Sequence, residues 1–391
     1  MDERPGPGRR RGPRPLMMHL ALAALSLPKT ISPGSNAASP TWNADWMSFL
    51  AQLHGSDVPE SPLPPPVDRD FIAGIAAYRR HPYVRDVTDP PAVWSCGSTS
   101  LLDYGGSGPA MLLVPSLVNR FTVLDLSSDR SMARFLAAQG FHVLLLDWGW
   151  PGAAEAELDL DALVTRRLLP VIEGLGAVIL VGYCMGGLLT LAAALHAPQV
   201  RALALLATPW DFHAGDAETV AGGRQLYDRL APLIAQQGGL SVDVLQALFS
   251  LGDPASVAAK YRAFAATEQD SDRARQFVAL EDWLNDGVPL TASVAEDCLQ
   301  GWYGENRPMT GCWTVAGTPV DPAGIRVPSF VAIPSRDRIV PPESAEPLAR
   351  LIPGARAHRP LAGHVGMVAG RDAAKALWRP LAEWATQAER K

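Results

Sequence analysis

Three residues far apart in the chain have the types and the order of a nucleophile, an acid and a base. Cys184 stands at the centre of "GYCMG", which fits the pattern G-x-nucleophile-x-G of a sharp strand-to-helix turn. Asp337 lies in "SRDRIVPP" and His364 in "LAGHVGMV". Chains with this turn place the acid and then the base after the nucleophile. The three residues therefore predict nucleophilic catalysis by a thiol.

Each of the three residues has an expected role. His364 would take the thiol proton of Cys184 and later activate the second nucleophile, while Asp337 would hold the imidazole tautomer and offset its charge. The alternative is structural: Cys184 as a small buried residue at a glycine-cornered turn, Asp337 as a loop acid and His364 as a helix cap. Because all three follow predicted strands in the required order, we favour the catalytic interpretation.

The turn also predicts an oxyanion hole built from backbone amides. The helix that begins at Met185 directs its positive end at Cys184, which favours the thiolate. The backbone N–H of Met185 can donate to a developing oxyanion. We expect the second donor in the loop that follows "LLVP", at Leu117 or Val118.

Two other aspartates compete for the role of the acid. Asp211 in "ATPWDFH" also follows a predicted strand, and we rank it second to Asp337, with helix capping as its structural alternative. Asp147 in "LLLDWGWP" precedes the nucleophile and is expected to shape the floor of the pocket. The remaining histidines show no ligand spacing, so we expect neither a metal nor a bound cofactor.

The elements that must position these residues are short apolar runs alternating with helical stretches. Strands buried on both faces of a parallel sheet have this appearance. The alternation predicts right-handed crossovers in a doubly wound α/β sheet, with ligands at the carboxyl ends of the strands. The predicted strands are 110–115, 141–148, 177–182, 200–209 and 327–334.

Residues 215–325 interrupt this alternation with a mainly helical stretch rich in Trp and Tyr. We interpret it as a cap that covers the site, and expect Cys184 to be largely buried beneath it. The predicted organisation is an N-terminal extension, partly flexible, over 1–68, a first part of the core over 69–214, the cap over 215–325, and the remainder of the core over 326–391.

Composition excludes several classes of protein. The chain has 391 residues, of which 48% are hydrophobic, and a formal net charge of −6 without a long basic run in the folded part, so nucleic acid is not an expected partner. Four cysteines without metal-type spacing are typical of a reduced cytoplasmic protein. The apolar run "LMMHLALAALSLP" is too short for a membrane span, and we expect a helix that packs onto the body, a partner or an apolar particle rather than a signal peptide.

Several longer stretches resemble one known family in order along the chain. They are "PSLVNRFTVLDLSSDRSMARFLAAQGFHVLLLDWGWP", "LVGYCMGG", "FVALEDWLNDG", "GCWTVAGTPVDPAGIRVPSFVAIPSRDRIVPPESAEPL" and "GHVGMVAG". Together they resemble polyhydroxyalkanoate synthases of the α/β-hydrolase superfamily, most closely the class III catalytic subunits. The resemblance covers roughly residues 70–385 and departs from the family at Arg338, where members usually have a His after the acid.

The resemblance implies an α/β-hydrolase fold and an acyltransferase. Cys184 would carry the acyl group, with Asp337 as acid and His364 as base. The substrate would be a 3-hydroxyacyl-coenzyme A thioester, and the product a polyester chain. The enzyme would be cytoplasmic, and its expected partners are the surface of the polyester granule and either a partner subunit or a second copy of the chain. A thiolate and a thiol leaving group make acyl exchange nearly isoenergetic, which suits this reaction.

Two alternatives to a synthase stay open. A thioesterase or intracellular polyester depolymerase would use the same three residues, with water in place of a chain hydroxyl. A granule-associated scaffold with an inactive hydrolase fold is the third hypothesis, and the complete set of three residues argues against it.

Overall fold

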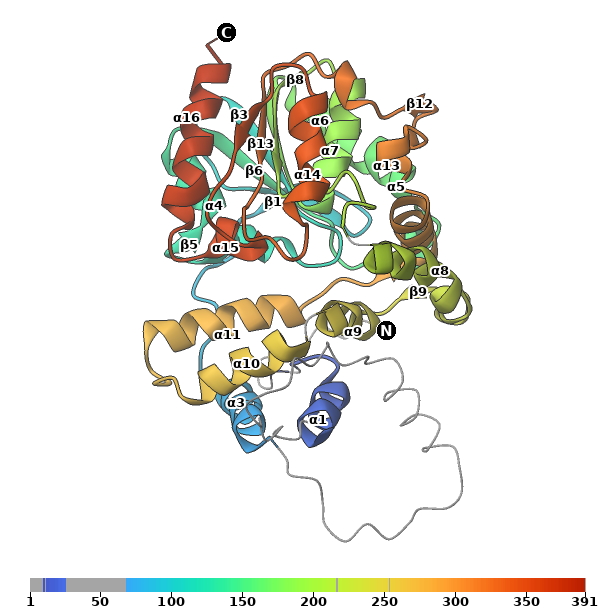
Figure 1. Ribbon diagram of the computed structural model, residues 1–391. Coiled ribbons are helices and arrows are strands. Elements are labelled where there is room, and N and C mark those ends of the chain that lie inside the picture. Colours follow the sequence, from blue (N-terminus) through green and yellow to red (C-terminus); the bar gives the residue numbers. More distant parts are fainter. Residues whose placement is uncertain (1–9, 11, 26–67, 216, 253, 391) are drawn as a thin grey trace, which may run out of the picture.

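The computed structural model describes residues 10, 12–25, 68–215, 217–252 and 254–390, and an eight-stranded sheet forms its centre (Figure 1). The strands lie in the order β1-β2-β6-β3-β7-β8-β13-β14. Pairing is antiparallel from β1 through β2 to β6 and parallel between all later neighbours. The expected α/β fold with a mostly parallel sheet is therefore confirmed. The bounds are β1 Ala92–Cys96, β2 Thr99–Asp103, β3 Ala110–Val114, β6 His142–Asp147, β7 Val178–Tyr183, β8 Val200–Leu206, β13 Ser329–Ala332 and β14 Arg356–His358.

Both faces of the sheet are covered, which explains the continuous apolar runs. On β3, Leu112 packs into the apolar cluster on one face and Leu113 into the cluster on the other, and both are fully buried. Strand side chains alternate between faces, so a strand covered on both sides must be apolar at every position. One face carries α6 (Leu169–Leu175), α7 (Met185–His196) and α14 (Pro342–Leu351), and the other carries α4 (Met132–Ala138) and α16 (Arg379–Ala388).

The predicted cap is a set of helices on the side of the sheet where the parallel strands end (Figure 1). Its buried residues Trp302 and Trp313 join the same apolar cluster as the sheet residue Leu205, so the cap packs directly on the core. The cap helices are α8 Ala217–Gln237, α9 Val242–Gly252, α10 Pro254–Ala265, α11 Asp272–Asn285, α12 Ala292–Glu296, the π-helical turn η4 Asp297–Gly304 and the short α13 Arg307–Thr310.

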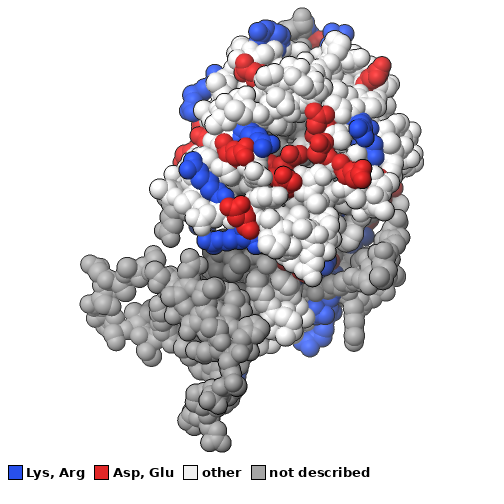
Figure 2. All heavy atoms as spheres, turned by 90° about the vertical axis from the view of Figure 1, so that its right-hand side faces the viewer, with Lys and Arg blue, Asp and Glu red and all other residues white. Residues whose placement is uncertain are grey.

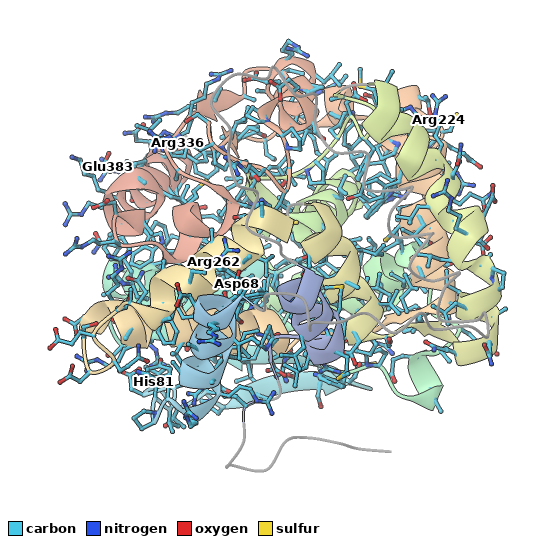
Figure 3. The ribbon with its side chains drawn as sticks, turned by 60° about the horizontal axis from the view of Figure 1, so that its bottom comes forward. Asp68, His81, Arg224, Arg262, Arg336 and Glu383 are labelled. Carbon is cyan, nitrogen blue, oxygen red and sulfur yellow. The ribbon has the colours of Figure 1, made fainter. Side chains whose placement is uncertain are left out.

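The first helix of the predicted core belongs with the cap. Helix α3 (Arg69–Arg80) lies against α10, where Arg262 pairs with Asp68 (Figure 3). A Cβ atom on Gly74 would lie 1.9 Å from the carbonyl oxygen of Tyr261, so only glycine permits this approach. The apolar face of α3 is thus buried by the cap, although the sequence interpretation places this helix at the start of the core.

Part of the N-terminal extension is described. Helix α1 (Leu16–Leu25) packs beside α3, in line with the expectation that this apolar run packs onto the body. Residues 26–67, which make up most of the predicted N-terminal extension, lie outside the described residues. None of the described helices has the length and apolar character needed to span a membrane.

Charged side chains of both signs are interspersed on the surface shown in Figure 2, where Asp and Glu gather near the middle of the face and Lys and Arg surround them. A continuous basic surface is not seen on this face among the described residues. This distribution agrees with the formal net charge of −6.

Candidate active site

Cys184 lies between β7 and α7 with φ 55° and ψ −126°, a backbone conformation that residues other than glycine rarely adopt. The turn is tight because its flanking glycines have no room for side chains. A Cβ atom on Gly186 would lie 2.3 Å from the carbonyl oxygen of Val114, and one on Gly182 would lie 2.2 Å from Thr190 Oγ1. The glycines of "GYCMG" therefore permit the strained turn that holds Cys184 above the sheet.

The structure brings Asp337 and His364 together from two loops. Asp337 follows β13, and His364 is the first residue of α15 (His364–Ala369). His364 Nδ1 and Asp337 Oδ2 are 2.7 Å apart, and the two side chains are buried. The other carboxylate oxygen accepts the backbone N–H groups of Ile339 and Val340, both at 2.9 Å. Both oxygens of the buried carboxylate thus have donors.

His364 also lies close enough to Cys184 for the two groups to interact electrostatically. Burial alone would lower the pKa of His364, but the adjacent Cys184 and the Asp337 carboxylate outweigh it and raise the pKa to about 10. Because Nδ1 faces Asp337, Nε2 is left to face the sulfur. The ring of Tyr183 lies 5.1 Å from the imidazole, between centroids, and helps to enclose it. The three predicted residues are therefore in one connected cluster.

The two competing aspartates are engaged elsewhere. Asp211 Oδ1 accepts the side-chain N–H of Asn306 at 2.8 Å and the backbone N–H of His213 at 3.0 Å, so it joins the loop after β8 to the cap. Asp147 forms an ion pair with Arg120, 2.8 Å from Nη2 to Oδ2. Of the three aspartates, Asp337 is the one that contacts His364.

The predicted oxyanion residues lie at the same edge of the sheet. Met185 begins α7 directly after Cys184, and Leu117 and Val118 lie in the loop after β3. This loop reaches Gly186, because the carbonyl of Pro115 is also 2.4 Å from a Cβ placed there. Within the described part of the chain, the amides of Leu117 and Val118 donate to no other backbone group. Their assignment to an oxyanion hole stays a prediction.

The cap approaches Cys184 without burying it completely. Cys184 is half-buried in the structure. Tyr303 of η4 is 42% exposed overall, yet desolvation and the nearby Cys184 raise its pKa to about 12. In the sequence, Tyr303 is one of several aromatic residues of the predicted cap, and no local signal places it near the sulfur.

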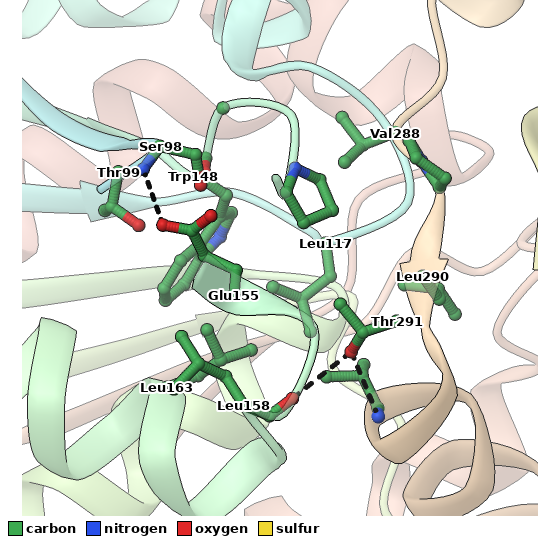
Figure 4. Close-up of a pocket in the computed structure, with 14 residues that line it drawn as sticks. Ser98, Thr99, Leu117, Trp148, Glu155, Leu158, Leu163, Val288, Leu290 and Thr291 are labelled. Atoms are coloured by element: carbon green, nitrogen blue, oxygen red, sulfur yellow. Dashed lines mark hydrogen bonds between the residues drawn. The ribbon is translucent and has the colours of Figure 1, made fainter. Parts of the chain in front are cut away.

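An apolar cavity of ≈ 50 Å³ lies where the loop after β3 meets the cap (Figure 4). Leu117 and Trp148 line it from the core, and Val288 and Leu290 line it from the cap.

The described residues include no group of three His, Cys, Asp or Glu side chains able to hold a metal ion.

Comparisons with known proteins agree with this fold and with the family resemblance. The family model described as alpha/beta hydrolase fold matches residues 109–369. Three relatives are named Poly(3-hydroxyalkanoate) polymerase subunit PhaC. That of Haloferax mediterranei is 30% identical over 70% of this chain and 58% of its own length. That of Haloarcula marismortui is 29% identical over 70% and 60%, and that of Allochromatium vinosum 28% identical over 70% and 79%.

The match is thus uneven in coverage: the chain spans somewhat under two thirds of the first two relatives and 79% of the third. The matched family model includes the strands β3 to β14 and all three residues of the cluster. This chain therefore belongs to the α/β-hydrolase fold family, and over 70% of its length it is similar to proteins named Poly(3-hydroxyalkanoate) polymerase subunit PhaC.

Proposed function

We propose that this chain is a polyhydroxyalkanoate synthase that transfers acyl groups from 3-hydroxyacyl-coenzyme A to a growing polyester through Cys184. The contact of Cys184, His364 and Asp337 at the carboxyl edge of the sheet carries the proposal. The relatives named as polymerases support the substrate class. The thioester is a substrate here, and the proposed chemistry needs no bound cofactor.

The first half of the reaction acylates the thiol. His364 takes the proton of the Cys184 thiol, and its pKa of about 10 favours the imidazolium that forms. The sulfur attacks the thioester carbonyl, and the amides of Met185 and of Leu117 or Val118 stabilise the oxyanion. The carbon–sulfur bond to coenzyme A then breaks, and its thiol leaves with the proton from His364. Asp337 keeps the imidazole oriented through both steps.

The second half transfers the acyl group to a hydroxyl. His364 Nε2 accepts the proton of the 3-hydroxyl of another acyl unit, whose oxygen attacks the acyl-enzyme carbonyl. An ester bond forms, the bond to the Cys184 sulfur breaks, and the thiolate is restored opposite the imidazolium. The apolar contact between the cap and the loop after β3 would limit water, which competes with the hydroxyl.

Hydrolysis of the acyl-enzyme is the second candidate. Cys184 is only half-buried, so water has a route to the thioester that a closed cap would block. A thioesterase or polyester depolymerase would use the same residues with the same roles. We place either activity in the cytoplasm at a polyester surface, because the product of the first and a substrate of the second are insoluble.

Incubation of the purified protein with 3-hydroxybutyryl-coenzyme A separates these functions. Free thiol with polymer is the expected result, whereas free thiol with monomeric hydroxy acid indicates the hydrolase. Mass spectrometry should find the acyl group on the peptide that contains Cys184. The Cys184→Ser variant should lose nearly all thiol release, because an alkoxide is much harder to form than a thiolate. A fully active variant would overturn the proposal.

A further inference from the structure

The loop after β3 is held from two sides by hydrogen bonds to its carbonyl groups. On the core side, Trp148 Nε1 donates to the carbonyl of Pro115 at 3.1 Å. On the cap side, the backbone N–H of Val288 donates to the carbonyl of Val118 at 3.0 Å. The loop thus connects the sheet to the segment that follows α11.

The carboxyl end of α11 makes the other contacts to this loop. Trp283 Nε1 donates to the carbonyl of Arg120 at 2.8 Å, and Asn119 Nδ2 donates to the carbonyl of Leu284 at 3.2 Å. Asn119 also pairs with Gly287 in an isolated antiparallel bridge. Three consecutive loop residues, 118 to 120, are therefore bonded to one short stretch of the cap.

Because peptide groups are planar, the hydrogen bonds to the carbonyl groups of this loop also restrict the directions of its N–H groups. Each fixed carbonyl also fixes the N–H of the next residue, because the two belong to one rigid plane. The peptides 115–116 and 118–119 are held at their oxygens, and the peptides that carry the Leu117 and Val118 amides lie between them. A shift of the cap at α11 would change the direction of these two N–H groups.

We propose that Trp283 and Asn119 are positioning residues, through which the cap orients the amides of Leu117 and Val118 toward the oxyanion. This proposal rests on the acyl transfer to Cys184 proposed above. Trp283 is largely buried, and its indole bridges helix and loop without reaching the reacting atoms. The cap therefore has a second role besides shielding Cys184. Its helix α11 holds the loop in the conformation in which the oxyanion hole is complete.

Two variants remove the hydrogen bonds between α11 and the loop with little change in side-chain shape. Trp283→Phe keeps a ring but deletes the N–H that binds Arg120, and Asn119→Leu keeps the branched shape but deletes the donor. Gln246→Met is the matched control, because Gln246 Nε2 donates to the same Leu284 carbonyl at 2.8 Å from within the cap. It removes a bond of the same kind and leaves the loop untouched. Thermal melts identify any variant that has failed to fold.

Two reactions of the same sulfur then separate positioning from general damage. Alkylation of Cys184 by iodoacetamide forms no oxyanion, whereas acylation by 3-hydroxybutyryl-coenzyme A does. We expect both variants to lose roughly ten- to a hundredfold in kcat for thiol release, with KM and the alkylation rate near wild type. Gln246→Met should keep its kcat within about twofold, well short of that loss.

The outcomes that overturn the proposal are distinct from failure of the proposed function. Equal losses in Gln246→Met and the two variants, or a parallel loss of alkylation, would show that the cap contacts act only on stability or access. Unchanged kcat in both variants would also overturn it. If the wild-type protein never carries an acyl group on Cys184, the proposed function fails instead.

Discussion

At the scale of single residues, the carboxylate of Asp337 binds two different partners. Oδ2 faces His364 Nδ1, and Oδ1 accepts the amides of Ile339 and Val340. Backbone donors hold the carboxylate in place before any substrate binds, and charge-assisted bonds of this kind are stronger than neutral ones. The acid is therefore fixed relative to the imidazole by its own loop.

Replacement of the two candidate acids by asparagine should distinguish them. Asp337→Asn removes the negative charge beside His364 and should lower kcat by about 10⁴-fold, as in other catalytic triads. Asp211→Asn keeps a side-chain oxygen for Asn306 and should change kcat by only a few fold. Steady-state thiol release measures both variants. A larger loss in Asp211→Asn would reverse the assignment of the acid.

His364 should make stability depend on pH. Its pKa is raised from 6.5 to about 10 in the folded protein, so folding favours the protonated ring. This stabilisation is complete below about pH 6.5 and is lost as the pH rises toward 10. In urea unfolding, the wild type should therefore lose its advantage over His364→Gln between these pH values. A constant difference across this range would contradict the raised pKa.

The partner of His364 can be tested in the same way. Cys184 is the largest of the influences that raise the pKa of His364. In Cys184→Ala the pKa of His364 should fall, and imidazole nitrogen shifts in NMR spectra would report its midpoint. An unchanged midpoint would mean that Asp337 alone sets the charge of the ring.

At the scale of elements, the turn around Cys184 depends on how closely β3 approaches α7. A Cβ atom on Gly186 would lie 2.3 and 2.4 Å from two backbone carbonyl oxygens, those of Val114 and Pro115. Backbone cannot move aside as a flexible side chain can. Any added atom must therefore displace the loop that begins at Pro115.

Gly186→Ala should lower both stability and activity. We expect a loss of about 1–3 kcal/mol in the free energy of unfolding, as for other overpacked sites, together with a lower kcat because the oxyanion loop moves. Gly174→Ala is the control, since Gly174 lies in α6 with nothing near its Cβ position. It should gain about 0.5–1 kcal/mol from helix propensity. Urea unfolding compares the two, and a tolerated Gly186→Ala would contradict the close approach.

The sheet and the candidate triad were accessible from sequence because their signals are local. Each parallel strand is a short apolar run, and the predicted strand 177–182 matches β7 to within one residue. Cys184 and Asp337 each follow such a run, His364 follows the short polar edge strand β14, and parallel strands bring their carboxyl ends to one edge. Order along the chain was therefore enough to predict that the three would meet.

Contacts between distant elements left no comparable signal. The approach of Gly74 to Tyr261 joins α3 to α10, and nothing in either stretch identifies the other. The bond from Trp283 to the Arg120 carbonyl involves a backbone group, which any residue type supplies. For the same reason, neither the packing of α3 on the cap nor the proximity of Tyr303 to Cys184 could be predicted from the sequence. Such contacts depend on packing geometry that apolar periodicity does not record.

At the scale of the whole molecule, the N-terminal segment fastens to the cap through arginines. Arg10 binds the Asp282 carboxylate at 2.8 Å and donates to the carbonyls of His81 and Tyr83. The backbone N–H of Arg14 donates to the side chain of Asn285 at 2.7 Å. Asp282 and Asn285 lie in the last turn of α11 or beside it, next to the residues that hold the loop after β3. The N-terminal segment thus adds contacts at the end of α11, where the cap meets the core.

Replacing Arg10 by Met should therefore destabilise the cap in a pH-dependent way. Burial raises the pKa of Asp282 and Arg10 opposes it, so removal of the guanidinium should raise this pKa further. In the variant, the Asp282 carboxylate is charged above its pKa and has lost the Arg10 cation, which lowers stability. Below that pKa the acid is neutral, and its burial costs less free energy. The deficit in Tm, about 2–4 °C for a partly buried ion pair, should be larger at pH 8 than at pH 5. Arg359→Met breaks an exposed pair with Glu346 outside the cap and should show a smaller deficit, with little dependence on pH over this range. Thermal melts at both pH values compare them, and equal deficits in the two variants would mean that the N-terminal segment does not stabilise the cap through Asp282.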